Sequence, residues 1–423
     1  MRSAHTVRPH RGDPVATAAA VAASGLLTDY VVYERPGRWF VAGNPIGAVR
    51  VYRDRVHSTL GGEYTEPANG RPWAQIRDAL HRAPTPRWRA YGWAGFELGR
   101  PGAVTHDGAL AHFMVPGVEL EITGTTVEIH SYDTSFDFEP EALRAVDGVA
   151  AAVRTDAIDT GYLRRVRAAL GRIGDGEFQK VILSRRVDLP FAVDMPATYA
   201  AIRRANTPAR SFLLDLGGWQ AAGVSPETVV EVDAGGLVAT RPLAGTRART
   251  GDAARDRALR DQLLADPKEI YEHATSVRLA CDELGRVGGD ARVRDFLAVA
   301  QRGSVQHLAS RVETRLHAGR TCWDALEAVH PSVTASGIPK AAARAAIGDL
   351  EPGTRDLYSG TVVRADSAGN LDTALILRAV YQRAGRSWLR AGAGVVAGSA
   401  PEREHEETCE KLASLAPYLI PAR

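Results

Sequence analysis

Two pairs of glutamates are the first residues in this chain whose type and spacing suggest chemistry. Glu404 and Glu407 lie within residues 391–411 (AGAGVVAGSAPEREHEETCEK), where a glycine-broken strand end runs into a predicted helix. Glu269 and Glu272 have the same spacing in a second predicted helix, so each pair projects from one helical face. Four carboxylates on two helices are oxygen ligands of the kind that Mg²⁺ prefers. The alternative for either pair alone is a solvated helix face.

Three further residues have a structural and a catalytic interpretation. Lys180 opens an apolar predicted strand, either as a solvated strand end or as a lysine that activates water. Glu227 follows a proline at the start of another strand, either as a turn residue or as a general acid. His307 has apolar neighbours, which is typical of a structural histidine.

Polar groups that bind anions form a second set of candidates. Arg378 interrupts an otherwise apolar stretch, and a guanidinium in such a place needs a carboxylate from the protein or from a bound acid. Tyr358 and Thr334 add hydroxyl donors in turns rich in glycine and serine. Together with the glutamates, these residues predict a pocket for an anion and a divalent cation.

Several familiar motifs are absent from the sequence or do not fit it. Gly392 and Gly394, with Gly398 beyond them, have the wrong spacing for a dinucleotide-binding fingerprint and follow an antiparallel meander. These glycines still let backbone amides approach an anion. The chain has no GxSxG elbow, no P-loop, no HExxH pair and no glutamine-amidotransferase cysteine motif.

The composition excludes some classes of protein. The 423 residues are 45% hydrophobic and 24% charged, with a net charge of +2, which argues against a nucleic-acid partner. The three scattered cysteines predict neither a zinc site nor a disulfide framework. No apolar run reaches the roughly 20 residues of a membrane span. The basic N-terminal stretch is interrupted by Asp13 and Pro14 before an alanine-rich segment, so we expect a first helix and a cytoplasmic protein.

The order of predicted elements indicates the fold class. Residues 30–53 alternate as in a β-meander, residues 252–286 are helical, and residues 136–153 read as a turn plus a helix. Near the C-terminus, strands at 358–365, 371–382 and 387–394 have connections too short for parallel pairing. We expect an α+β fold with large antiparallel sheets flanked by helices. It would be a single domain, residues 1–423, with a β-rich N-terminal half (about 1–150) and a second half (about 151–423).

Many motifs in this order resemble those of the chorismate-utilising enzymes, which include the anthranilate, isochorismate and salicylate synthases. The matching stretches are FQKVILSRR (178–186), GVSPETVVEV (223–232), PLAGTR (242–247), KEIYEH (268–273), VQHLAS (305–310), HPSVTASGIPKAAA (330–343), LYSGTVV (357–363), LDTALILRA (371–379) and AGAGVVAGSAPEREHEETCEKL (391–412). YVVYE (30–34) and YGWAGFEL (91–98) extend the resemblance over nearly the whole chain. The resemblance implies the layered α/β/β/α fold of anthranilate synthase component I.

The resemblance also implies a role for each candidate residue. Lys180 would be the base that activates water, and Glu227 the general acid. Glu269, Glu272, Glu404 and Glu407 would hold Mg²⁺. The residues that would contact chorismate are Gly245, Thr246, His307, Thr334, Tyr358, Leu377, Arg378, Gly392, Gly394 and Lys411.

Within the family, the sequence is most similar to the bacterial salicylate synthases of siderophore pathways. These add water to chorismate to give isochorismate and then eliminate pyruvate in the same pocket. Lys180 favours water addition, because anthranilate synthases typically carry Gln there, and Ala244 replaces the lysine expected in aminodeoxychorismate synthases. Arg241 departs from the acidic residue expected in salicylate synthases. Because Lys180 favours the addition of water, no glutaminase subunit is expected.

Three other functions remain open from the sequence. One is an isochorismate synthase that releases its product, and another is an ammonia-dependent enzyme of the anthranilate type. The third is a protein that binds chorismate without converting it, which the presence of base, acid and metal carboxylates disfavours.

Overall fold

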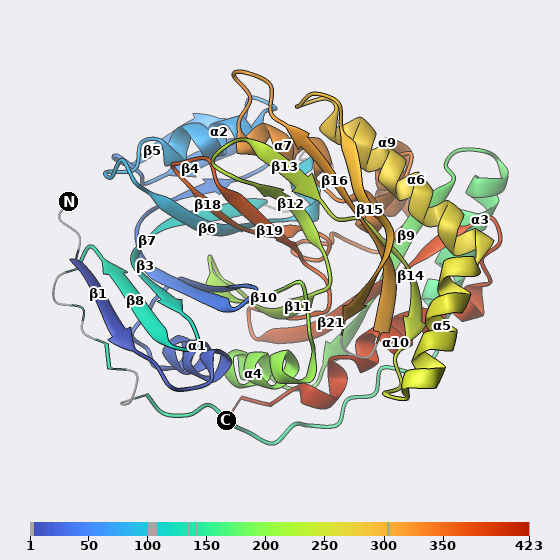
Figure 1. The fold of residues 1–423 in the computed structure, drawn as a ribbon, viewed down its shortest axis with the longest axis horizontal. Coiled ribbons are helices and arrows are strands. Elements are labelled where there is room, and N and C mark those ends of the chain that lie inside the picture. The colour runs from blue at the N-terminus through green and yellow to red at the C-terminus, as the bar shows by residue number, and fades with distance from the viewer. Residues whose placement is uncertain are drawn as a thin grey trace.

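A computed structural model describes residues 4–99, 108–133, 136, 138–139, 143–302 and 305–422 (Figure 1). The strands are β1 Ala4–Pro9, β2 Tyr30–Arg35, β3 Arg38–Val51, β4 Arg55–Ser58, β5 Tyr64–Pro67, β6 Arg89–Ala94, β7 Ala111–Ile122, β8 Thr126–Ser131, β9 Lys180–Leu189, β10 Arg210–Leu216, β11 Trp219–Ser225, β12 Thr228–Val232, β13 Leu237–Thr240, β14 Leu243–Ala248, β15 Arg292–Arg302, β16 Val305–Arg315, β17 Gly337–Ile338, β18 Thr361–Asp366, β19 Leu371–Leu375, β20 Ala379–Arg383 and β21 Arg386–Val396.

The helices begin where the sequence supplies capping residues. The side chains of Asp159, Asp194 and Asp266 accept backbone N–H groups at the starts of α3, α4 and α6. In the described ranges, none of the helices is long and apolar enough to cross a membrane. The helices are α1 Pro14–Ala23, α2 Pro72–Leu80, α3 Thr160–Gly174, α4 Met195–Ala205, α5 Ala253–Ala265, α6 Pro267–Leu284, α7 Cys322–Val329, α8 Val333–Ser336, α9 Lys340–Leu350 and α10 Pro401–Ala413, with 3₁₀ turns η1 Phe96–Gly99 and η4 Ala416–Tyr418.

The strands form two antiparallel sheets that share the β3–β7 pair. One sheet continues from β3 through β2, β10, β11, β20 and β21 to β9. The other continues from β7 through β6, β18, β19, β12 and β13 to β16. Figure 1 shows the sheets facing each other, with α1 and α4 outside one and α2 and α7 outside the other. The expected α+β fold with antiparallel sheets between helices is confirmed.

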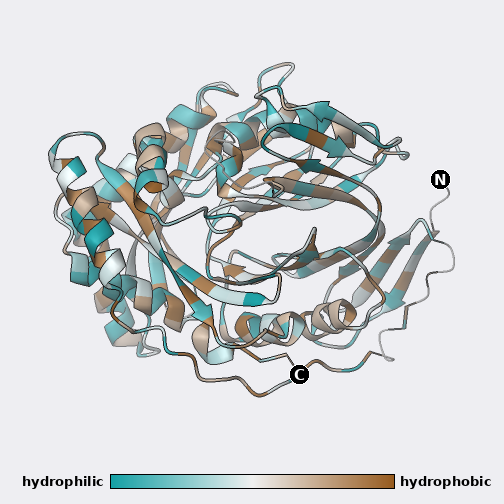
Figure 2. Ribbon diagram, turned by 180° about the vertical axis from the view of Figure 1, so that it is seen from behind, coloured by the Kyte–Doolittle hydropathy of each residue, from teal (hydrophilic) through white to brown (hydrophobic). Residues whose placement is uncertain are grey.

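An apolar cluster fills the space between the sheets. Tyr33, Phe212 and Trp388 come from one sheet, and Tyr91 and Trp93 come from the other. Separate clusters bury the helices against the outer faces. In Figure 2, hydrophobic and hydrophilic residues alternate along many strands and helices, as expected of elements with one buried face. The core therefore holds the two sheets at a fixed separation.

The predicted strand at residues 371–382 is two strands, so this prediction was wrong in detail. β19 pairs with β12 and β18 in one sheet, whereas β20 pairs with β11 and β21 in the other. The chain crosses between the sheets at residues 376–378, where Arg378 has a φ of 48°. Apolar residues lie on both sides of this crossing because both strands are buried, so the hydropathy shows no break apart from Arg378 itself.

The helix predicted within residues 136–153 is also wrong for the described part. Residues 143–153 contain no helix. Leu143, Val146 and Val153 instead pack singly against the cluster that covers α1 and α4, and the Ala151 N–H donates to the Leu419 carbonyl. Leu143, Val146 and Val153 are therefore partly buried along a path without helix, which a helical interpretation of their spacing missed.

Candidate active site

Two neighbouring crossings between the sheets carry Glu227 and Arg378. The chain passes from β11 to β12 at residues 226–227 and from β19 to β20 at residues 376–378. The crossings lie side by side, because the Val224 N–H donates to the Arg378 carbonyl at 3.0 Å and the Leu375 N–H donates to the Glu227 carbonyl at 3.1 Å. Two polar side chains are thus fixed where the backbone leaves a sheet.

Glu227 has the environment of an acid that is protonated near neutral pH. Its side chain is buried, with 7% of the residue exposed. Burial raises the pKa of its carboxyl to about 8, against hydrogen bonds from the Thr334 hydroxyl and the Leu243 N–H. The Thr334 Oγ1 lies 3.0 and 3.1 Å from the two carboxyl oxygens. A protonated carboxyl held in this way suits a proton donor.

Lys180 lies at the start of β9, opposite the end of β21. Its Nζ donates to the Glu272 carboxylate on α6 at 3.0 Å. Gly394 of β21 leaves room for this side chain, since a Cβ at Gly394 would lie 3.0 Å from the Lys180 Cε. The glycine is therefore required by the approach of a side chain rather than by an unusual backbone conformation.

The predicted metal glutamates lie on α6 and α10, and three of the four pair with cations of the protein. Glu404 is buried, and burial raises the pKa of its carboxyl. No three of the four carboxylates offer oxygens within 4.8 Å of one another. The ion pairs are Glu272–Lys180 at 3.0 Å, Glu269–Arg247 at 3.3 Å and Glu407–Lys411 at 2.6 Å.

The donor set fits magnesium by its chemistry. Every candidate ligand is a carboxylate, and Mg²⁺ prefers oxygen ligands. The two helices are near enough for their charges to interact, because Lys268 of α6 acts on the carboxyl of Glu404. Closing the set around an ion requires side-chain rotations that exchange the present ion pairs for ligand bonds.

Arg378 is a cation that lacks a protein anion in direct contact. In the described parts of the chain its guanidinium makes no hydrogen bond or ion pair, and Glu407 acts on it only through its field. Burial lowers the pKa of this guanidinium. A carboxylate of a bound molecule would compensate for the lost hydration, so the residue is suited to binding an anion.

Tyr358, Gly392 and Lys411 form one contact group beside β21. The Lys411 Nζ donates to the Gly392 carbonyl at 2.8 Å. A Cβ at Gly392 would lie 2.9 Å from the Tyr358 hydroxyl and 2.7 Å from the Leu183 carbonyl. Leu377 is half-buried at the crossing. It packs against the cluster between the sheets and against the cluster that includes residues of α2 and α7. The group presents an ammonium and a phenol next to Glu407.

His307, Thr246 and Gly245 meet across the β14–β16 pair. The His307 Nδ1 lies 3.0 Å from the Thr246 hydroxyl and 3.3 Å from the Gly245 carbonyl. A carbonyl only accepts, so Nδ1 carries the hydrogen, and the buried Nε2 has no partner. Burial, followed by the charge of Arg378, lowers the His307 pKa to about 4, so the imidazole is neutral. Gly245 has a φ of 68°, and a Cβ there would lie 2.9 Å from the Glu269 Oε2.

A buried ion network behind the site was not predicted from the sequence. Glu351 has a fully buried side chain that accepts from Arg355, Arg390 and both the hydroxyl and the N–H of Ser184. Arg355 and Arg390 also lie 5.6 and 5.4 Å from the centre of the Tyr358 ring. The network connects β9, β21 and the turn before Tyr358. The four-residue spacing of Glu351 and Arg355 was the one sequence signal for it.

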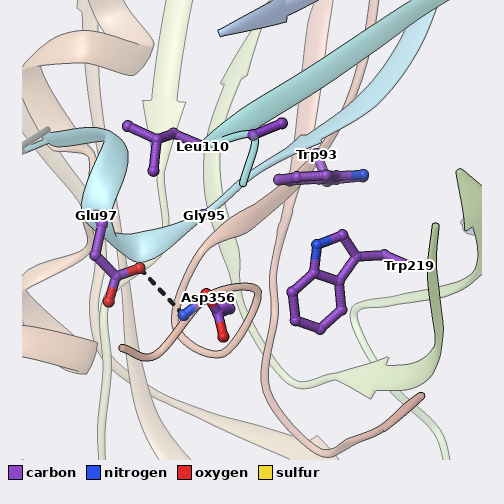
Figure 3. Close-up of a pocket in the computed structure, with 7 residues that line it drawn as sticks. Trp93, Gly95, Glu97, Leu110, Trp219 and Asp356 are labelled. Carbon is purple, nitrogen blue, oxygen red and sulfur yellow. Dashed lines mark hydrogen bonds between the residues drawn. The ribbon is translucent and has the colours of Figure 1, made fainter. Parts of the chain in front are cut away.

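The small cavity in Figure 3 is separate from the predicted site residues. It measures about 10 Å³ and lies between η1 and the turn at Asp356, lined by Trp93, Trp219 and Leu110 among others. Glu97 accepts the Arg355 and Asp356 N–H groups at 2.6 and 3.1 Å. The N-terminal half thereby anchors the turn that leads to Tyr358, and none of the predicted site residues lines the cavity.

Several known proteins are similar to this chain in sequence or in fold. The chain is 43% identical over 422 residues to the salicylate synthase of Mycolicibacterium paratuberculosis, covering 96% of this chain and 93% of that protein. It is 40% identical over 270 residues to anthranilate synthase component 1 of Thermus thermophilus, covering 63% and 58% of the two chains. The menaquinone-specific isochorismate synthase of Escherichia coli shares the fold, with a TM-score of 0.80 over 99% of this chain and 94% of that one at 22% identity. The family of chorismate binding enzymes matches residues 29–417. This chain therefore belongs to the chorismate binding enzyme family.

Proposed function

We propose that the chain is a magnesium-dependent salicylate synthase that converts chorismate into salicylate and pyruvate through isochorismate. The observation that carries the proposal is the buried carboxyl of Glu227, whose pKa of about 8 keeps a proton available at neutral pH. The near full-length similarity to a salicylate synthase supports the same substrate. The four glutamates of α6 and α10 would hold the Mg²⁺, which supplies positive charge to neutralise the substrate carboxylate when it is bound.

In the first step, water adds to the ring and the ring hydroxyl departs as water. Lys180 takes a proton from water while the water oxygen bonds to the ring carbon beside the carboxylate-bearing carbon. Both ring double bonds shift, the C–O bond to the ring hydroxyl breaks, and Glu227 gives its proton to the departing hydroxyl. One water enters and one water leaves, so isochorismate is an isomer of chorismate.

In the second step, isochorismate splits without adding or losing atoms. The hydrogen on the carbon that bears the new hydroxyl passes to the methylene of the enolpyruvyl group, and the ether C–O bond breaks. The ring becomes aromatic as salicylate, and the side chain leaves as pyruvate. We assign Arg378, Lys411 and Tyr358 to holding the substrate in the conformation that this transfer needs, which is an orientation effect.

An isochorismate synthase that releases its product is the second candidate. The same base, acid and metal ligands would serve it, and the fold is shared with such an enzyme. Similarity over the whole chain to a salicylate synthase favours the two-step activity. Arg241, the departure from the salicylate synthase pattern, is exposed.

The remaining expectations from the sequence are part of the same proposal. The two halves would act as one domain, because a strand of one half pairs directly with a strand of the other half in each sheet, β2 with β10 and β6 with β18. The enzyme would work in the cytoplasm, without a glutaminase subunit, and supply salicylate for a siderophore.

A pair of lysine variants tests the role assigned to Lys180. Lys180→Gln should abolish chorismate consumption in the presence of Mg²⁺, because water loses its base. Lys268→Gln on α6 is the matched control, since Lys268 has a largely exposed side chain 4.0 Å from the same Glu272, and it should retain near wild-type turnover. Turnover by the Lys180→Gln variant comparable to the control would refute the assignment.

A further inference from the structure

The β1–β8 pair at the N-terminal edge brings together side chains that bind metal ions. His5 of β1 lies directly opposite His130 of β8, and the two imidazole rings stack with centroids 4.3 Å apart. Glu128 is two residues before His130 and therefore projects from the same face of β8. Its Oε2 lies 3.6 Å from the His5 Nε2.

These three side chains meet the geometric requirement that the glutamates of α6 and α10 do not. One ligand atom from each of His5, Glu128 and His130 lies within 4.8 Å of the others, and they form the single such cluster in the described residues. The side chains of His5 and Glu128 are about half exposed, at 50% and 42%, so an ion can enter from solvent and keep bound water. Rotation of the stacked rings would turn both imidazole nitrogens toward one ion.

We propose that His5, His130 and Glu128 form a binding site for a divalent first-row transition metal ion such as Zn²⁺. Two imidazoles and one carboxylate suit zinc, copper, nickel or cobalt rather than magnesium. Glu119, which lies opposite His130 on β7, is already bonded to Arg89 and Tyr91 and is not part of the set.

The site lies far from the proposed catalytic residues and has a structural consequence. Figure 1 places β1 and β8 at one end of the molecule, and α6 and α10 at the other. Within the described ranges β1 pairs with β8 alone, so it is an edge strand held on one side. An ion bound by His5 and both β8 residues would cross-link this edge strand to the sheet, and it would stabilise the folded state by mass action.

The test is a calorimetric titration of the full chain with Zn²⁺ while Mg²⁺ is saturating, which measures the stoichiometry and affinity of zinc binding. The wild type should bind one Zn²⁺ per chain in this way. His5→Ala and His130→Ala should each weaken this binding at least about tenfold, in line with the loss of a ligand or its support. His57→Ala is the matched control, because His57 pairs with Glu63 at 3.1 Å on another edge hairpin and lacks a second histidine there. It should leave the affinity unchanged.

Hydrogen exchange of β1 gives a second, independent readout. Zn²⁺ should slow exchange of the β1 amides in the wild type and in His57→Ala, but not in His5→Ala. His5 is at the exposed edge, so His5→Ala should fold and consume chorismate normally, which separates this test from the proposed function. No zinc binding by the wild type, or equal binding by His5→Ala, would overturn the proposal.

Discussion

At the scale of single residues, the site depends on burial that controls charge. Glu227 is kept protonated because its carboxyl is removed from water, and no cation is among the main causes of its pKa. His307 is neutral for the same reason, and its unpartnered Nε2 can accept a hydrogen bond from a substrate hydroxyl. Arg378 stays charged without a direct partner, which prepares the pocket for a carboxylate.

Glu227→Gln should remove the proton donor and lower kcat by about 10²–10⁴-fold. Stability should change in a defined direction, because the folded pKa of about 8 lies above the unfolded value of 4.5. Between these values the folded state binds more protons, so the wild type loses stability as pH rises from 4.5 to 8. Thermal unfolding should therefore show that the Glu227→Gln variant loses less stability than the wild type between pH 4.5 and pH 8.

Wild-type turnover should also fall above pH 8, as Glu227 loses its proton. An Asp215→Asn variant, at a half-buried carboxylate on β10 bonded to Gln220, serves as the control for general effects of removing a charge. A Glu227→Gln enzyme with normal kcat would contradict the assigned acid role.

At the scale of elements, the functional groups come from places where strands end or cross. β11 leads into β12, and β19 into β20, at crossings between the two sheets, which fixes Glu227 and Arg378 side by side. α10 follows β21 and places Glu407 near enough to Lys180 for the lysine charge to act on the Glu407 carboxylate. The pocket is thus built from local breaks in two regular sheets.

Glu407→Gln should raise the Mg²⁺ concentration needed for half-maximal rate by at least about tenfold, since one of four carboxylate ligands is lost. Glu406→Gln is the matched control on the same helix, because Glu406 is exposed and bonds only to Arg403 in the described contacts. The measurement is the initial rate of chorismate consumption against Mg²⁺ concentration. An unchanged Mg²⁺ dependence in Glu407→Gln would exclude this residue as a ligand.

The regular elements were predictable from the sequence, and the crossings were not. Alternating patterns and turns gave the meander at residues 30–53 and the strands near the C-terminus, and the helical prediction for residues 252–286 corresponds to α5 and α6. Residues 371–382 looked like one strand because the hydropathy does not change where the chain passes between sheets. β15 was not predicted from the sequence, and its residues are mostly exposed.

The site was predictable in its members but not in its contacts. Family motifs named Lys180 and Glu272 separately, while the hydrogen bond between them depends on how α6 packs near β9. The protonated state of Glu227 depends on burial by both sheets, which no local pattern records.

At the scale of the whole molecule, the network around Glu351 connects the two strands that carry the site. Its carboxylate is fully buried yet charged, because Arg355 and Arg390 overcome the effect of burial and lower its pKa to about 2. Ser184 and Arg390 tie β9 and β21 to the same carboxylate. The positions of Lys180, Gly392 and Tyr358 therefore rest on one ion cluster.

Glu351→Gln should destabilise the protein by about 3–5 kcal/mol, because two buried guanidinium groups lose their counterion. The wild-type contribution is present above the unfolded pKa of 4.5 and is lost as pH falls toward 2, so the difference should shrink in acid. Denaturant unfolding at several pH values measures this difference in the free energy of unfolding between the wild type and the Glu351→Gln variant. Glu402→Gln, at an exposed ion pair with Arg167, should change stability by less than about 1 kcal/mol. Equal effects of the two variants would contradict the role of the network.

The most direct test of the proposed salicylate synthase activity is to incubate the purified chain with chorismate and Mg²⁺ and to identify the products by mass and fluorescence. Salicylate and pyruvate should form in equal amounts, with no dependence on added ammonium. Isochorismate that accumulates without pyruvate would contradict the second step, and anthranilate formed with ammonium would contradict the first.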